Sequence, residues 1–192
     1  MQNILSLFLA FGLWSCQSTE QNHGQKSDLV LAAEFLELNL VEGLMYADGV
    51  LFTGIAQKKN STGSLIMEAH YQNGKKHGLY RMWFENGDLS YQADYKHGKR
   101  HGTVKSWWQN GLQRSESNYN MGIAHGMQKQ WYNSGQLFKE INLVNGKEEG
   151  LQRAWRENGV LYTNYEAKNG RIFGLKRATL CYQLEDEYVQ FD

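Results

Sequence analysis

Residues 71–94 read YQNGKKHGLYRMWFENGDLSYQAD, and residues 95–118 repeat the pattern as YKHGKRHGTVKSWWQNGLQRSESN. The same 24-residue spacing relates the members of three glycine series and one tryptophan series: Gly78, Gly102, Gly126, Gly150 and Gly174; Gly74, Gly98, Gly122, Gly146 and Gly170; Gly87, Gly111, Gly135 and Gly159; and Trp83, Trp107, Trp131 and Trp155. A fixed period of this length indicates a repeat protein, in which one small structural unit is stacked many times.

Each unit divides into two short runs rich in aromatic side chains, separated in residues 71–94 by Asn86-Gly87. Asn-Gly between two such runs is a strong signal for a β-hairpin with a two-residue turn, in which both turn residues have positive φ. We expect the same turn at Asn110-Gly111 and Asn158-Gly159. A helix would need apolar residues at 3.6 spacing and would be weakened by these glycines. The sequence therefore predicts an all-β fold, an elongated antiparallel meander of 24-residue hairpins with roughly 11 strands.

A two-residue turn at Asn86-Gly87 also fixes which residues lie opposite each other on neighbouring strands. The predicted pairs, with their equivalents in the next two units, are Trp83 with Ser90, Arg81 with Gln92, Lys105 with Glu116, and Lys129 with Glu140. Opposite charges on facing residues stabilise a sheet, so these pairs support the register. An exposed pair contributes at most about 1 kcal/mol, so we expect the pairs to fix register more than stability.

Four tryptophans and four basic residues recur on one face of the predicted sheet. They are Trp83, Trp107, Trp131 and Trp155, beside Arg81, Lys105, Lys129 and Arg153. In a sheet with one layer, we expect each ring to cover the sheet and to pack on the stem of a neighbouring basic side chain. The alternative is an exposed aromatic surface that binds lipid, sugar or protein. Replacing Trp131 by Ala separates the two, because packing predicts lost stability and binding predicts lost partner capture.

The N-terminal residues have the features of an export signal. Residues 4–16 form an apolar run that is too short to span a bilayer and fits the core of a secretory signal peptide. Leu13-Trp14-Ser15-Cys16 resembles a bacterial lipobox, in which the cysteine becomes the acylated first residue. We therefore predict a lipoprotein signal peptide over residues 1–15 and a lipid anchor at Cys16, on the periplasmic or outer-membrane side of a bacterial envelope. Ordinary secretion and a buried N-terminal segment are the alternatives.

Three further segments complete the predicted domain organisation: a tether and capping segment at residues 16–43, the repeat domain at residues 44–176, and a closing strand with an acidic tail at residues 177–192. Residues 17–28 are polar and are typical of a flexible tether. The apolar residues 29–40 form either a helix or an extended strand, and we expect them to cover the first repeat, because the ends of stacked repeats need caps.

The sequence predicts no catalytic site, no metal site and no cofactor. His77, His101 and His125 share one phase of the repeat, but residues one unit apart lie about 9–10 Å from each other, too far to share one zinc ion. Known nucleophile and metalloprotease motifs are missing from the sequence. Twenty basic and twenty acidic residues give zero net charge, which argues against nucleic acid as a partner. We expect a monomer that binds another protein.

The pattern Tyr-x-x-Gly-Lys-x-His-Gly, followed by Trp, Asn-Gly and Leu, resembles the bacterial variant of the MORN repeat. Residues 71–78 and 95–102 match it best, and the resemblance covers about residues 44–176. Bacterial chains of this kind are commonly described as YwqK-like antitoxins of toxin–antitoxin systems, so the resemblance implies such a role. Eukaryotic MORN proteins are associated with membranes and acidic lipids, but their repeats open differently.

Three classes of function follow from these observations. The first is a non-enzymatic scaffold for protein interaction, anchored to the membrane through Cys16. The second is an antitoxin or immunity protein that binds a toxin through the same sheet, although a cytoplasmic antitoxin needs no signal peptide. The third is a binder of cell-wall carbohydrate or choline, which the aromatic pairs Trp83-Phe84, Trp107-Trp108 and Trp131-Tyr132 suggest.

Overall fold

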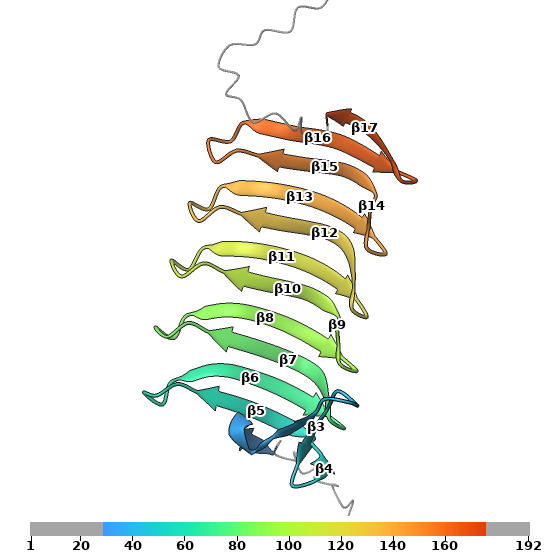
Figure 1. Ribbon diagram of the computed structural model, residues 1–192. Coiled ribbons are helices and arrows are strands. Elements are labelled where there is room, and N and C mark those ends of the chain that lie inside the picture. Colours follow the sequence, from blue (N-terminus) through green and yellow to red (C-terminus); the bar gives the residue numbers. More distant parts are fainter. Residues whose placement is uncertain (1–28, 176–192) are drawn as a thin grey trace, which may run out of the picture.

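The computed structural model describes residues 29–175 of the 192-residue chain. Hairpins follow one another in sequence order along one antiparallel sheet (Figure 1). The hairpin strands are β5 (Gly54–Lys59), β6 (Leu65–Gln72), β7 (Lys75–Trp83), β8 (Leu89–Lys96), β10 (Gly102–Trp107), β11 (Gln113–Asn120), β12 (Ile123–Trp131), β13 (Leu137–Val144), β15 (Gly150–Trp155), β16 (Leu161–Lys168) and β17 (Arg171–Leu175). The predicted all-β meander is therefore confirmed.

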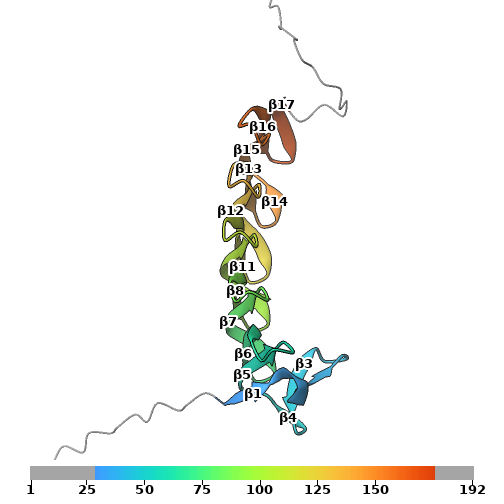
Figure 2. The same ribbon diagram turned by 90° about the vertical axis from the view of Figure 1, so that its left-hand side faces the viewer.

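The sheet is a single layer along most of its length. Figure 2 shows it edge-on, with one hairpin stacked on the next and, among the described residues, a second layer only at the N-terminal end. The sheet has 14 strands when β1 and the two-residue strands β9 (Lys99–Arg100) and β14 (Lys147–Glu148) are included. Side chains in such a sheet can be covered only by their neighbours on the same face.

The N-terminal residues cover the first hairpin. Strand β1 (Val30–Ala32) pairs in parallel with β5, and a short 3-10 helix, η1 (Ala33–Phe35), follows it. Strands β2 (Glu37–Asn39), β3 (Leu44–Ala47) and β4 (Val50–Leu51) then form a separate three-stranded sheet, which projects to one side in Figure 2.

This small sheet closes the main apolar core of the described residues. Phe52, Ala56 and Ala69 are buried there, and Leu31 and Met45 pack against them. Residues 29–40 are thus mostly extended, one of the two conformations expected for them. The regular hairpins begin at Gly54 and not at residue 44, because β3 and β4 belong to the small sheet.

The predicted signal peptide at residues 1–15, the lipid anchor at Cys16 and the tail at residues 177–192 lie outside the described residues and stay predictions. Within residues 29–175, no helix is long and apolar enough to cross a membrane.

The Asn-Gly turns differ from the sequence prediction. At Asn86-Gly87 and at the two equivalent turns, only the glycine has positive φ, 90° at Gly87 and 82° at Gly111. The N–H of Gly87 donates to the carbonyl of Phe84 at 3.0 Å, and the N–H of Phe84 donates to the carbonyl of Asp88 at 2.8 Å. This is a three-residue loop that ends in a left-handed glycine. The predicted two-residue turn with positive φ at both residues is therefore wrong.

An extra residue after each of these loops restores the predicted register. Met82 lies opposite Tyr91 and Trp83 lies opposite Leu89, so Ser90 has no facing residue and forms a bulge. The predicted pair of Trp83 with Ser90 is wrong for this reason. Beyond the bulge the strands have the register that a two-residue turn would give. The confirmed pairs are Arg81 with Gln92, Lys105 with Glu116, and Lys129 with Glu140.

Two-residue turns with positive φ at both residues lie at the other end of the hairpins. They are Asn73-Gly74, His97-Gly98, Met121-Gly122, Asn145-Gly146 and Asn169-Gly170. Their glycine N–H groups link neighbouring units, since Gly98 donates to the carbonyl of Lys76 at 2.8 Å and Gly122 donates to that of Arg100 at 2.7 Å. This glycine series therefore both reverses the chain and stacks the units.

The His-Gly dipeptides that follow these turns insert a second bulge. Arg100 lies opposite Tyr95, and Lys105 lies opposite Gln92. The chain therefore advances five residues from Arg100 to Lys105 while its partner strand advances only three, from Gln92 to Tyr95. Gly102, with φ of 81°, allows the chain to make this detour. The two bulges per unit keep equivalent residues of every hairpin aligned across the sheet.

Replacing Gly159 by Ala tests the three-residue loop. The φ of 84° at Gly159 is unfavourable for Ala, while an added Cβ meets no atom within 4 Å, so the cost is conformational. We expect Gly159→Ala to lower the free energy of unfolding by about 1–2 kcal/mol. Asn158→Asp keeps the side-chain oxygen that accepts from the N–H of Val160 and should change it by less than about 0.5 kcal/mol. Urea unfolding measures both, and equal losses would contradict this turn geometry.

Candidate interaction surfaces of the sheet

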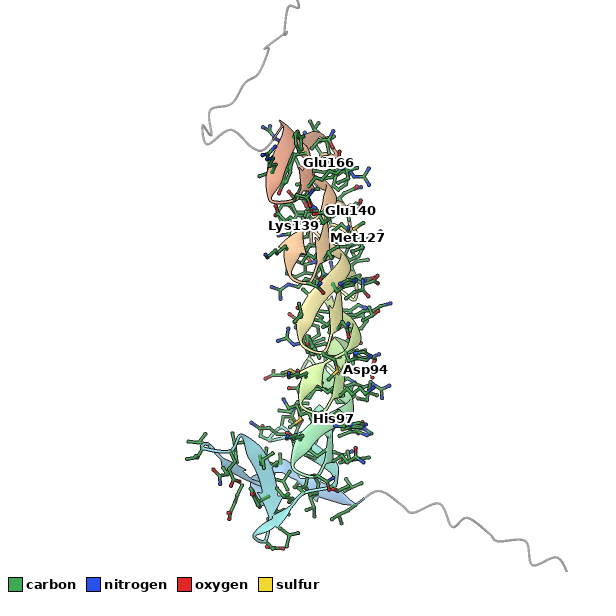
Figure 3. The ribbon with its side chains drawn as sticks, turned by 90° about the vertical axis from the view of Figure 1, so that its right-hand side faces the viewer. Asp94, His97, Met127, Lys139, Glu140 and Glu166 are labelled. Carbon is green, nitrogen blue, oxygen red and sulfur yellow. The ribbon has the colours of Figure 1, made fainter. Side chains whose placement is uncertain are left out.

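The two faces of the sheet have different chemistry. Successive residues of a strand alternate between the faces, and the register aligns them in rows across the sheet. One row defines what we call the ladder face: Gln57, Glu68, Arg81, Gln92, Lys105, Glu116, Lys129, Glu140, Arg153 and Asn164. The adjacent row defines the opposite, tyrosine face: Ala56, Ala69, Tyr80, Ala93, Val104, Ser117, Gln128, Ile141, Gln152 and Tyr165. Figure 3 shows side chains extending from both faces.

The four predicted basic residues of the ladder face all contact acidic or amide side chains of neighbouring strands. The shortest contacts surround Glu140, which lies 3.0 Å from Nζ of Lys129 and 2.7 Å from Nη2 of Arg153. Lys105 contacts Glu116 at 3.4 Å, and Nε of Arg81 donates to Gln92 at 3.4 Å. The sequence predicted one partner for Glu140. Its second partner, Arg153, belongs to the next unit, and that alignment depends on the equivalent bulge at Glu149-Gly150.

The four tryptophans lie half-buried at the ends of the strands that carry these basic residues. The guanidinium of Arg153 lies 5.3 Å from the ring centre of Trp155, as the packing hypothesis expects. Within residues 29–175, no ring contact joins one tryptophan to the next. The aromatic residues that follow them connect the units, because Trp108 Nε1 donates to the carbonyl of Trp131 at 3.2 Å and Tyr132 donates to that of Trp155 at 3.0 Å.

Some residues at the histidine phase of the repeat cap the turn of the following unit: Thr53 accepts from the N–H of Asn73 at 2.9 Å, and His125 accepts from that of Asn145 at 3.4 Å. His77 instead packs against His97, with ring centres 5.3 Å apart. In the part of the chain that the structure describes, no three His, Cys, Asp or Glu side chains are placed to hold a metal ion.

Tyrosines and cations gather on the tyrosine face, over β7, β8 and β9. Ala69 and Ala93 are fully buried in the sheet there. The ring of Tyr80 packs against the Ala69 cluster and lies 5.9 Å from the rings of both Tyr91 and Tyr95. Nζ of Lys76 lies 4.6 Å above the Tyr80 ring and 5.3 Å from that of Tyr95. These contacts are cation–π interactions, which hold the ammonium group without neutralising its charge.

The same residues line a groove of about 510 Å³, which we call the tyrosine groove. Its cations are Lys76, Arg100 and Arg114, and its aromatic rings include Tyr80, Tyr91, Tyr95 and Trp107, so one member of the predicted tryptophan series lies in this groove. Its lining contains no carboxylate. Burial, followed by the neighbouring Tyr95, raises the pKa of Tyr91 to about 12, so this phenol stays protonated at neutral pH. The groove therefore presents positive charge, aromatic rings and hydrogen-bond donors.

Sequence reasoning missed the tyrosine groove. Lys76 and Arg100 share one phase of the repeat, but Ala124 and Glu148 occupy it in later units, so the basic residues do not form a series. Arg114 comes from a different phase. A search for basic residues one or two strands from the series Tyr71, Tyr95 and Tyr119 would have found part of it.

A family model described as MORN repeat variant matches residues 76–97 and 124–145. The two segments begin 48 residues apart (124 − 76), which is two of the 24-residue units. The resemblance to MORN repeats is thus supported at these two places, and it indicates a repeat scaffold for binding. No curated protein matches the chain.

Removing the charge of Glu140 should destabilise the sheet more than removing that of Glu116. The Glu140 side chain is 11% exposed and has two cationic partners, whereas the Glu116 side chain is 32% exposed and has one, Lys105. We expect Glu140→Gln to lower the free energy of unfolding by about 1–2 kcal/mol and Glu116→Gln by less than about 1 kcal/mol. Urea unfolding in low salt checks this order, and the reverse order would contradict the ladder.

Replacing Trp131 by Ala separates packing from binding in the tryptophan series. Because the ring is half-buried, we expect a loss of about 1–3 kcal/mol. Thermal melts of Trp131→Ala and Trp155→Ala measure it. Melting temperatures equal to that of the parent would mean that the rings are a surface feature, and the ladder face would then become the better binding candidate.

Proposed function

We propose that this protein is a non-catalytic scaffold that binds a partner protein in the tyrosine groove while Cys16 attaches it to a membrane of a bacterial envelope. The observation that supports this proposal most is the contrast between the two faces. The cations of the ladder face contact acidic or amide side chains of the sheet itself. Lys76, Arg100 and Arg114 instead lie against aromatic rings, where their charge stays available.

The chemistry of the groove favours binding over catalysis. General acid–base catalysis most often uses histidine or a carboxylate, and lysine or tyrosine serves as a base when its pKa is lowered toward the working pH. The groove is lined by no histidine, carboxylate or thiol, and burial raises the pKa of Tyr91 to about 12, away from neutral pH.

The membrane anchor is supported by the sequence. Residues 4–16 have the apolar character of a signal peptide, and Cys16 follows them in a lipobox-like context. The polar residues 17–28, which the sequence predicts to be a tether, would separate this anchor from the sheet.

The second candidate function is neutralisation of a toxin, as an antitoxin or immunity protein of the YwqK-like kind. The resemblance of the sequence to bacterial MORN repeats implies it, whereas the family match itself names only the repeat. It differs from the first proposal in the identity of the partner. Carbohydrate or choline binding is less favoured, since Trp108 and Tyr132 of the proposed aromatic pairs donate to the backbone of the next unit.

A photo-crosslinking amino acid tests which face binds protein. Met82 lines the tyrosine groove and is 40% exposed, and Met127, on the ladder face, is 37% exposed and labelled in Figure 3. We expect the photo-reactive residue to capture a protein in envelope preparations when it replaces Met82 and not when it replaces Met127. Capture from position 127 alone, or from neither position, would contradict the proposal.

Acylation can be tested with the two cysteines of the chain. Cells that express the full chain should incorporate labelled fatty acid into it, and Cys16→Ser should abolish the label and release the protein from the membrane fraction. Cys181→Ser is the matched control and should keep both properties. A Cys16→Ser protein that stays labelled and membrane-bound would show that Cys16 is not the anchor.

A further inference from the structure

We infer that the tyrosine groove takes an acidic peptide segment of the partner protein in extended conformation, with its carboxylates on Lys76, Arg100 and Arg114. This inference rests on the proposed function and adds the chemistry of the segment that is bound.

The charge balance of the groove supports an anionic ligand. Among residues 29–175, none of the three cations takes part in an ion pair. Arg100 donates to the hydroxyl of Tyr119 at 3.2 Å and lies 5.2 Å from its ring centre, while Arg114 lies 4.7 Å from the ring of Trp108. These neutral partners orient the guanidinium groups, and their charge stays uncompensated. A carboxylate that entered the groove would be their first anionic partner.

The hydrogen-bonding groups of the groove favour carboxylates over neutral sugars. Ammonium and guanidinium groups only donate hydrogen bonds, and an ionised carboxylate only accepts them. A sugar hydroxyl also needs acceptors, and among the side chains that line the groove only the hydroxyls of Ser90, Ser106 and the tyrosines can accept. The hydroxyl of Ser106 is already bonded to that of Ser115 at 2.6 Å.

The spacing of the cations suits an extended peptide. Lys76 and Arg100 occupy the same position one unit apart, so they lie about 10 Å apart along the long axis of the sheet. An extended chain in polyproline II conformation has three residues per turn and advances about 3.1 Å per residue, so acidic side chains three residues apart lie on the same side of it, about 9 Å from each other. The intervening side chains would contact the rings of Tyr80, Tyr91 and Tyr95, which favours apolar or aromatic residues between the acidic ones.

The groove has two ends, which limits the segment to a few residues. On the N-terminal side, Tyr80 packs against the cluster of Phe52 and Ala69, which the small sheet closes. On the C-terminal side, the phase of Lys76 and Arg100 continues as Ala124 and then as Glu148, whose carboxylate accepts from the hydroxyl of Tyr165 at 2.9 Å. At this position of the repeat, a cation therefore gives way to a carboxylate along the sheet, and we expect an acidic segment to bind at the end that carries Lys76 and Arg100.

Fluorescence anisotropy with a labelled peptide, GEYGEYGEYG, tests this inference directly. We expect the full-length protein to bind it, with an affinity that falls as salt is added. The double variant Lys76→Glu, Arg100→Glu should weaken binding by about tenfold or more. The matched control is the double variant Lys75→Glu, Lys99→Glu. It makes the same change of charge at the exposed preceding residues, which lie on the ladder face because successive residues of a strand alternate between the faces. This control should bind the peptide within about twofold of the parent. Circular dichroism melts verify that both variants fold.

Three results would overturn the inference. One is equal binding of the neutral peptide GQYGQYGQYG, another is equal loss of binding in the two double variants, and the third is tighter binding to phosphatidylglycerol vesicles or polygalacturonate than to the acidic peptide. If position 82 crosslinks a protein while the acidic peptide fails to bind, the inference is wrong and the proposed function stands. If position 82 captures no protein, the proposed function itself fails.

Discussion

The register of one strand against the next is the constraint on which the rest of this structure depends. A single-layer sheet has no opposing layer to bury its side chains, so each side chain is covered by its neighbours in the same row. A slip of one residue would move every side chain to the other face. Two turns and two bulges in each unit prevent this slip, and Gly87 and Gly102 show why glycine is needed where the backbone takes positive φ.

The same register produces two faces with different uses. On the ladder face, acidic and basic side chains alternate between neighbouring strands and satisfy each other, with Glu140 between Lys129 and Arg153 as the closest case. On the tyrosine face, alanines bury the centre of the sheet and leave space for tyrosine rings, which support Lys76 and Arg100 without neutralising them. Most of the buried side chains thus lie on the tyrosine face, while the paired charges of the ladder face fix the register.

The fold could be predicted from the sequence because the 24-residue period and the opposite charges on facing residues can be read directly from it. The pair of Lys105 with Glu116 was predicted correctly even though the turn was not, since a three-residue loop and one bulged residue give the same register as a two-residue turn. Turns with positive φ at both residues occur at His97-Gly98 and Met121-Gly122, where the first residue is not the usual Asn, so dipeptide preferences could not locate them. The tyrosine groove was not predicted because Arg114 and Lys76 come to line one groove only through the pairing of strands from different units.

Deleting one unit tests the central claim that a 24-residue period holds the sheet in register. Removal of residues 103–126 joins Gly102 to Met127 in phase, whereas removal of residues 103–125 removes one residue fewer and shifts every following strand. We expect the in-phase deletion to keep a β-sheet circular dichroism spectrum and one cooperative urea transition at a lower midpoint, and the out-of-phase deletion to lose the transition. Equal unfolding behaviour of the two deletions would contradict the account.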